Sequence, residues 1–248
     1  MSDHCQELVA KADKDRFLSC LFAPRDTQPH LFALYAFNVE IARIRETVSE
    51  PQIGLVRQQW WLDTIDGIYA GHTPDHPVAQ ALAQAIAKGD LPKHALRNLI
   101  IAREFDLYDD PMPTLSDLEG YLGETSSSLI QMAALILDKG AAEAAGLAGV
   151  AFGLAGVLRL QKSRYLPRDM VQTLGEKQTI NQLCTHARKR LTEARAHLGS
   201  IPVQALPAFL PARLTELYLR RIERGGTLDV SQIRRQVTLW WAARNNRF

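Results

Sequence analysis

The sequence has few of the features that mark disulfide-stapled, metal-binding or membrane-spanning proteins. Its three cysteines, Cys5, Cys20 and Cys184, are far apart and form no CxxC pair. This spacing argues against a disulfide framework or a zinc ribbon and fits a reducing compartment. The longest apolar stretch, residues 144–158, is shorter than the ~20 residues that a helix needs to cross a bilayer. Its glycine content favours a buried helix.

An excess of charge of one sign is also missing. The 29 lysines and arginines nearly balance the 27 aspartates and glutamates, which leaves a net charge of +2. So balanced a chain is not expected to bind nucleic acid in general. The first fifteen residues mix acids with lysines and hold no apolar run, so they match neither a signal peptide nor a mitochondrial presequence. We therefore expect a cytoplasmic protein.

No convincing two-residue alternation of apolar side chains occurs, whereas helical three- and four-residue spacing dominates. The connections are short, and there is no repeat, linker or low-complexity tract. A chain of this length can form one large domain, so we expect a single all-α domain over residues 1–248. The expected helices span residues 30–48, 53–69, 78–88, 93–108, 114–138, 141–160, 176–198, 207–224 and 230–243.

Sequence motifs of nucleotide-binding and hydrolytic sites are absent: there is no GxSxG, P-loop, GxGxxG or HExxH. Asp63 and Asp66 lie three residues apart on a predicted helix, a spacing that could hold Mg²⁺ with a diphosphate. A solvated helix face explains the same pair more simply. His72 and His76 are separated by Pro74, so they do not share a helix face and predict no zinc site.

Four glycines, Gly146, Gly149, Gly153 and Gly156, lie on one face of the predicted 141–160 helix. Each glycine costs about 1 kcal/mol of helix propensity relative to alanine. Such a face serves close packing of another helix, or it forms one wall of a ligand cavity. The sequence leaves both interpretations open.

The last part of the chain is basic, with eight arginines between residues 213 and 247. Its final predicted helix also carries Ile233, Val237, Trp240 and Trp241. Arginine together with tryptophan suits the interface of a membrane or of a protein partner. The alternative is a terminal helix that docks on the core with its polar face in water.

Five short motifs, in the same order along the chain, resemble those of the squalene/phytoene synthase family. That family joins two prenyl diphosphates with the help of Mg²⁺, and its first motif typically reads YAFCRxxDDIVD. The similarity covers roughly residues 13–175. The matching segments are Leu34-Tyr35-Ala36-Phe37, Trp60-Trp61 with residues 66–71 and 76–78, Phe105-Asp106-Leu107, Gly120-Tyr121 with Thr125, and Tyr165-Leu166-Pro167.

The chain departs from this family where the family holds its metal ions. The three aspartates of the first motif are replaced by Ala42, Arg43 and Glu46. In the second motif, NxxRDxxED, Arg159 matches the arginine while Leu160 replaces the aspartate. Mg²⁺ needs carboxylate and phosphate oxygens as ligands, so the resemblance implies neither a metal site nor a catalytic residue.

This pattern resembles a branch of the family whose members assist the assembly of respiratory complex I. The resemblance implies an isoprenoid-synthase-type bundle of helices around a central cavity, without cofactor. It implies a subunit or assembly intermediate of the complex as partner, with peripheral contact to the inner membrane through residues 213–248. The missing presequence points to a bacterial member, or to a mature chain, rather than to a mitochondrial precursor. Two alternatives remain open: an active prenyl transferase that uses Mg²⁺ with Asp63, Asp66 or Glu46, and a binding protein for a prenyl lipid.

If the helix of the first motif keeps its orientation in the family, its degenerate face borders the cavity. Tyr35, Arg43, Glu46 and Arg159 are then the candidates for a cavity or anion-binding site. We expect Arg43 to pair with Glu46, or to bind an anion without metal, with Arg159 as a second donor from the facing helix. The alternative is that Arg43 points into solvent.

Overall fold

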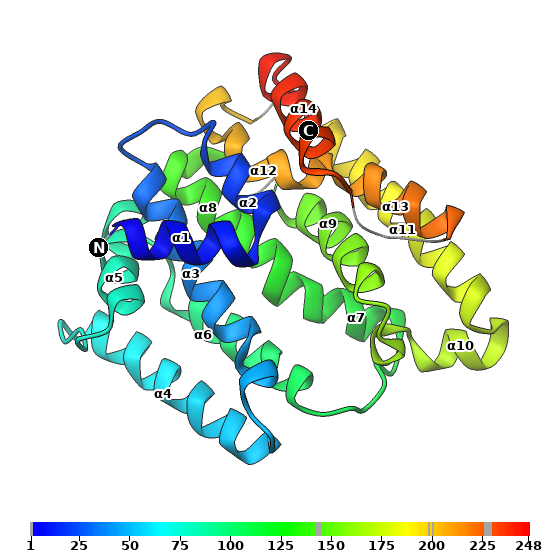
Figure 1. Ribbon diagram of the computed structural model, residues 1–248, viewed down its shortest axis with the longest axis horizontal. Helices are drawn as coiled ribbons and strands as arrows, with labels where there is room; N and C mark the ends of the chain where they lie inside the picture. The colour runs from blue at the N-terminus through cyan, green and yellow to red at the C-terminus, as the bar shows by residue number, and fades with distance from the viewer. Residues whose placement is uncertain (1, 142–144, 198, 200, 226–229) are drawn as a thin grey trace.

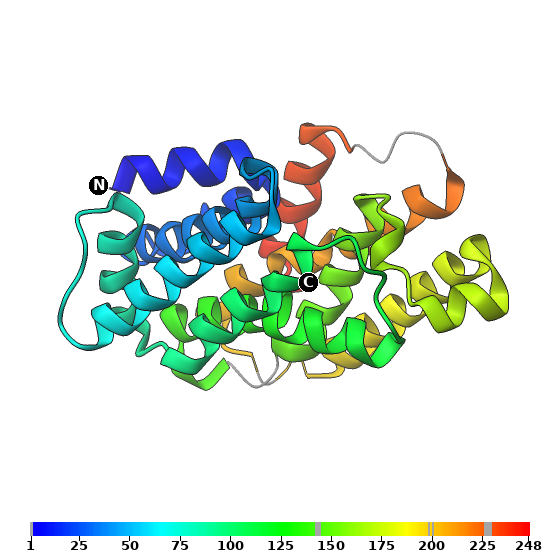
Figure 2. The ribbon, with the colours of Figure 1, turned by 90° about the horizontal axis from the view of Figure 1, so that it is seen from below.

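The computed structural model describes residues 2–141, 145–197, 199, 201–225 and 230–248. Throughout these ranges every regular element is a helix, which confirms the all-α prediction. The N-terminal helices lie at one end of the molecule and α10 with α11 at the other (Figure 1 and Figure 2). The α-helices are α1 (Ser2–Ala12), α2 (Lys14–Cys20), α3 (Gln28–Ala42), α4 (Pro51–Tyr69), α5 (Pro77–Gly89), α6 (Lys93–Ala102), α7 (Leu115–Leu122), α8 (Ser128–Leu137), α9 (Ala145–Arg159), α10 (Arg168–Leu174), α11 (Glu176–Ala196), α12 (Leu206–Arg213), α13 (Thr215–Arg224) and α14 (Gln232–Arg244).

The structure divides several of the helices expected from the sequence. The segment 30–48 becomes α3 followed by a 3₁₀ turn, Ile44–Thr47, and 93–108 becomes α6 followed by a 3₁₀ turn, Arg103–Leu107. The segment 207–224 becomes α12 and α13, which meet at Leu214. Helices α1, α2 and α10 had no counterpart among the expected elements. Residues 142–144 of the expected 141–160 helix and residue 198 of the 176–198 helix lie outside the described residues.

The core is built around α3, which is apolar on nearly all sides. Ten of its residues are buried, from Leu31 to Ile41. A helix that is hydrophobic all round must be covered on every face, and α3 packs against α1, α5 and α8. Figure 1 shows α1 lying across it. No helix among the described residues has the length and hydropathy that a bilayer crossing requires.

A π-helical turn, Gly123–Ser127, separates α7 from α8 within the expected 114–138 helix. Such a turn inserts one extra residue into a helix and rotates the residues that follow. As a result Thr125, Ser126, Ser127 and Ser128 are all buried. The Ser127 hydroxyl donates a hydrogen bond of 2.7 Å to the carbonyl oxygen of Gly146 at the start of α9.

The glycine face of α9 serves both purposes that the sequence left open. A Cβ atom added at Gly149 would lie 2.2 Å from Cα of Ser127, and one at Gly153 would lie 2.9 Å from Cβ of Ser126. These two glycines therefore let α9 approach the π turn closely. Gly156 has open space around it and lines a cavity.

An ion pair between Glu119 of α7 and Arg190 of α11 connects two elements that are distant in sequence. Arg190 donates two hydrogen bonds to Glu119, of 2.7 and 3.0 Å, and Nε2 of His186 lies 2.8 Å from the same carboxylate. Burial alone would raise the pKa of Glu119, but the hydrogen bonds from Arg190 and His186 outweigh it and hold the pKa below its ordinary value.

We expect Glu119→Gln to lower the free energy of unfolding by about 1–2 kcal/mol at pH 7. Because the folded pKa is depressed, this contribution is present above the unfolded value of 4.5 and is lost as the pH falls through the lower folded pKa. Urea unfolding of both proteins across the acid range measures it. A gap between wild type and variant that does not shrink with acid would contradict this account of the ion pair.

Candidate functional site

A cavity of about 470 Å³ opens between α2, α7 and α9 and contains the glycine edge of α9. Phe152, Val157 and Leu160 supply apolar surface. Basic side chains outnumber acidic ones three to one, so the cavity is suited to an anion rather than a cation. The basic residues are Lys11, Lys14, Arg16, Arg103, Arg159 and Arg235, and the acidic residues are Asp13 and Asp15.

Arg16 lies deep in this cavity. Asp13 caps the N-terminus of α2 by accepting a hydrogen bond from the backbone N–H of Arg16, and its carboxylate also binds the Arg16 guanidinium at 2.5 Å. The guanidinium carbon lies 5.6 Å from the ring centre of Tyr35 and 5.2 Å from that of Phe152. The Nε atom of Arg16 is buried and has no hydrogen-bond partner.

Asp15 joins four helices at one side of the cavity. The Tyr218 hydroxyl of α13 donates a hydrogen bond of 2.6 Å to Asp15, and Arg159 of α9 lies 3.6 Å from the same oxygen. Arg235 of α14 lies 3.5 Å from the other oxygen, and the Arg159 guanidinium stacks 3.8 Å above the Tyr218 ring. Burial raises the pKa of Asp15 above its ordinary value, although the Tyr218 hydrogen bond opposes this effect.

On the opposite side of the cavity, Asp106 holds three lining side chains in place. Its carboxylate accepts hydrogen bonds from Tyr165 at 2.7 Å, from Tyr121 at 3.0 Å and from Arg103 at 3.0 Å. Burial is the largest cause that raises the pKa of both tyrosines above the ordinary value, so they remain hydroxyl donors. The family-like segment Phe105-Asp106-Leu107 thus acts here as a buried structural anchor.

The four residues predicted for the site do not lie together. Tyr35 is buried in the core beneath Arg16. Arg43 lies 3.9 Å from Glu46, with both side chains more than half exposed, and lines a separate groove with Arg57. Arg159 lines the basic cavity. The structure thus contains the Arg43–Glu46 contact but does not bring Arg43 and Arg159 into one cavity, because the side of α3 that carries Arg43 faces the groove beside α4.

The other acidic pair considered from the sequence has neighbours of its own. Asp63 accepts a hydrogen bond from Gln59, and Asp66 contacts Lys93 at 2.9 Å and Arg97 at 2.6 Å. The hydrogen bond from Lys93 is the main cause that lowers the pKa of Asp66. Within the described part of the chain no three His, Cys, Asp or Glu side chains are grouped so that they could hold a metal ion.

His76 acts as a helix cap and as an aromatic contact. Its ring accepts a hydrogen bond of 3.4 Å from the backbone N–H of Ala79 at the start of α5. The ring also lies edge-on to Trp60 and Trp61.

The sequence did not single out Asp15, Arg16 or Tyr218 as functional residues. Asp15 and Tyr218 are 203 positions apart, so no local spacing connects them. One usable signal was present: Asp13 in front of Lys14 is an N-cap residue that predicts the start of α2. That start would have placed Asp15 and Arg16 on an ordered helix.

Together, the helices form a bundle of the isoprenoid-synthase type whose cavity is lined mainly by basic side chains. The squalene/phytoene synthase family model matches residues 9–241, and the chain belongs to this family. The fold is shared with a dehydrosqualene synthase, at a TM-score of 0.84 over 98% of this chain and 95% of that chain, with 18% identity. It is also shared with squalene synthase HpnC from Alicyclobacillus acidocaldarius, at a TM-score of 0.73 over 100% and 95%, with 19% identity.

Several other proteins share a higher sequence identity with the chain than these solved structures do. The chain is 35% identical over 244 residues to NADH dehydrogenase (ubiquinone) complex I, assembly factor 6, of Bos taurus, which covers 89% of this chain and 73% of the relative. It is 34% identical over 247 residues to the protein of the same name from Homo sapiens, covering 90% and 74%. The homolog from Drosophila melanogaster is 30% identical over 255 residues, covering 91% and 76%.

Proposed function

We propose that this protein assists the assembly of a membrane respiratory complex of the complex I type and has no catalytic activity of its own. The names of the relatives support the assembly role. The observation that carries the non-catalytic part is the replacement of family carboxylates by Ala42, Arg43 and Leu160. A subunit of the complex, or an assembly intermediate, is the proposed partner.

The residues of the basic cavity do not fit Mg²⁺. A hard divalent cation needs several carboxylate oxygens. The cavity offers two carboxylates, and both are already engaged: Asp13 with Arg16, and Asp15 with Tyr218 and two arginines. Six basic side chains around the same space would repel the ion. This cavity therefore supports no metal-dependent reaction.

A gene deletion in the native organism tests the proposal. We expect the membranes of the deletion strain to lose NADH dehydrogenase activity of complex I and to accumulate an incomplete complex on native gels. The full chain, expressed from a plasmid, should restore both. Normal complex I in the deletion strain would contradict the assembly role.

A variant separates the non-catalytic proposal from the enzyme alternative. Glu46→Gln, Asp63→Asn and Asp66→Asn together remove the carboxylates that an unusual diphosphate site would need. Glu46 and Asp63 are exposed, and Asp66 is half-exposed beside Lys93 and Arg97. The triple variant should restore complex I as well as the wild type does. Failure to restore it, at an equal level of folded protein, would favour a working transferase.

The purified protein should release no diphosphate from farnesyl or geranylgeranyl diphosphate, with Mg²⁺ or Mn²⁺ and with or without NADPH. The reason is that the carboxylates that bind metal in the family are missing. The double variant Ala42→Asp with Arg43→Asp should also be inactive, because Leu160 still replaces the aspartate of the second motif. Phosphate release after pyrophosphatase treatment measures the reaction. Sustained release that depends on metal, and that a cavity variant abolishes, would overturn the proposal.

A second candidate function is the binding of an anionic prenyl lipid without chemistry. The excess of basic side chains in the cavity, Arg16 among them, favours it. Farnesyl diphosphate in the presence of EDTA should then bind and raise the melting temperature, and Arg16→Gln should weaken this binding. Equal binding by the Arg43→Gln variant would be expected, because Arg43 lines a different groove. If farnesyl diphosphate does not raise the melting temperature of the wild type, this second function is excluded.

We further propose that the protein works in the cytoplasm at the surface of the inner membrane, in contact with it through residues 213–248. The arginines of this segment support the contact. Residues 226–229 of the segment lie outside the described residues.

A further inference from the structure

Helix α14 turns an apolar stripe toward solvent. Ile233, Val237, Trp240 and Trp241 occupy positions i, i+4, i+7 and i+8 and therefore share one face. Their exposed fractions are 73%, 59%, 54% and 45%. In a terminal helix that merely covers the core, this face would be polar.

The opposite face of α14 attaches the helix to the protein. Arg235, Leu239 and Ala242 are buried on that side. Arg235 reaches Asp15 at 3.5 Å, and α14 packs against α12 and α2. The helix is thus anchored mainly by its inner face. Of the outer stripe, Trp241 also contacts α12, with its ring centre 5.5 Å from the guanidinium carbon of Arg213. Contiguous exposed apolar surface of this kind marks a site of interaction.

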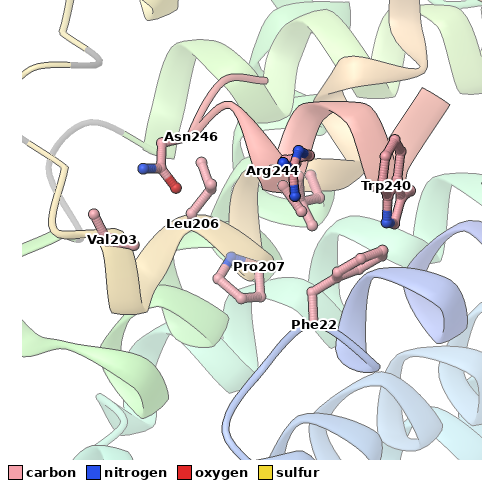
Figure 3. Close-up of a pocket in the computed structure, with 9 residues that line it drawn as sticks. Phe22, Val203, Leu206, Pro207, Trp240, Arg244 and Asn246 are labelled. Carbon is pink, nitrogen blue, oxygen red and sulfur yellow. The ribbon is translucent and has the colours of Figure 1, made fainter. Parts of the chain in front are cut away.

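A groove beside α14 continues the stripe. It has a volume of about 380 Å³ and lies between α14, α12 and the turn after α2. Phe22 lies below Trp240 in Figure 3, with Leu206 and Pro207 of α12 to their left. Its lining contains Arg244 and no acidic side chain.

The charged side chains of the segment that carries the stripe all have one sign. From Val230 to Phe248 the sequence holds four arginines and no aspartate or glutamate. Arg235 is the inward one, while Arg234, Arg244 and Arg247 are exposed. The guanidinium of Arg244 lies 5.9 Å from the ring centre of Trp240, so that charge and aromatic surface are presented together.

We propose that α14 inserts its outer stripe, with Phe22, into the interface of an anionic lipid bilayer and lies in the plane of the membrane. Tryptophan and branched apolar side chains suit the boundary between headgroups and acyl chains, while the exposed arginines meet lipid phosphates. The absence of aspartate and glutamate from Val230 to Phe248 and from the groove lining favours an anionic surface over a second copy of this chain or a protein of mixed charge. The inference rests on the proposed membrane contact and not on the assembly role.

Another apolar stripe of the molecule provides a matched comparison. On α4, Ile53, Val56 and Trp60 are exposed as well. That helix also carries Asp63 and Asp66 and is preceded by Glu50, so its surface lacks the uniform positive charge. It should not bind the membrane.

Flotation of the full chain with lipid vesicles tests the inference. The protein should float with vesicles in which about a third of the phosphatidylcholine is replaced by phosphatidylglycerol, and much less with phosphatidylcholine alone. Binding should fall when NaCl is raised from about 0.1 to 0.5 M, because salt screens the arginine–phosphate attraction. No flotation with anionic vesicles would overturn the proposal.

Two double variants identify the surface. Ile233→Asp with Val237→Asp should weaken vesicle binding roughly tenfold or more, whereas Ile53→Asp with Val56→Asp introduces the same charges at the same residue types on α4 and should bind as the wild type does. Circular dichroism checks that both remain folded, which their exposed positions favour. Equal binding by both variants, or equal loss in both, would overturn the assignment to α14.

Brominated lipids report insertion directly. They should quench part of the tryptophan fluorescence of the wild type, and Trp240→Phe with Trp241→Phe should remove that quenching while Trp60 and Trp61 remain. The alternative is that a second copy of the chain covers the stripe. Sedimentation would then show a dimer of the wild type without vesicles and a monomer of the α14 variant. Failure of the wild-type protein to bind anionic vesicles, together with loss of complex I in the deletion strain, would contradict this inference and leave the assembly role standing.

Discussion

Replacing Asp106 with alanine should lower the free energy of unfolding by about 3–5 kcal/mol. The carboxylate accepts hydrogen bonds from Arg103, Tyr121 and Tyr165, and only 8% of its side chain is exposed. Without it, the guanidinium of Arg103 and two hydroxyls lose a common partner in the interior, where water replaces it poorly. Urea unfolding followed by circular dichroism measures the loss.

Asp109 provides the control three residues further along the chain. It also forms ion pairs, with Arg164 at 3.2 Å and Arg45 at 3.7 Å, but its side chain is 82% exposed. Asp109→Ala should therefore cost less than about 1 kcal/mol. If both variants unfold at the same urea concentration as the wild type, Asp106 does not anchor this side of the cavity.

Gly149→Ala should destabilise the protein by about 1–3 kcal/mol or more, although alanine is the better helix former. The added Cβ atom would lie 2.2 Å from Cα and 2.7 Å from the backbone nitrogen of Ser127. Both are main-chain atoms of the π turn, so relief requires α9 to move away from that turn. Thermal unfolding measures the cost as a lower midpoint temperature.

The same substitution at Gly156, on the same helix, isolates the effect of close packing. No atom lies within 4 Å of a Cβ atom built there. Gly156→Ala should be neutral or stabilise the protein by up to about 1 kcal/mol through helix propensity alone. A destabilisation equal to that of Gly149→Ala would mean that glycine flexibility, rather than contact with Ser127, explains the sequence pattern.

Much of the fold could be predicted because helical periodicity is a local property. The helices α4, α5 and α11 begin within two residues of their expected starts, where Pro51, Pro77 and Gly175 mark the boundaries. The π turn at Gly123–Ser127 could not be predicted in this way. It depends on contacts with α9, a segment from Gly146 onward that lies some twenty residues away in sequence.

The candidate site was predicted less completely than the fold. Arg159 does line the basic cavity, and Tyr35 does lie beside it under Arg16. Arg43 was expected to face Arg159 because the helix of the first motif was assumed to keep the orientation that it has in the family. Arg43 keeps the helical backbone hydrogen bond to Val39, but its side of α3 lines the groove beside α4 and not the basic cavity.

By itself, the sequence determined the all-α class, the family and the loss of the metal-binding carboxylates, because these follow from spacing and residue identity along the chain. Only the tertiary structure decided which surfaces face inward. Helix α14 carries apolar side chains on two faces, and a periodic pattern shows which residues share a face but not which face the core covers. The pairing of Arg235 with Asp15, together with the burial of Leu239 and Ala242, settles that choice and leaves Ile233, Val237, Trp240 and Trp241 outside.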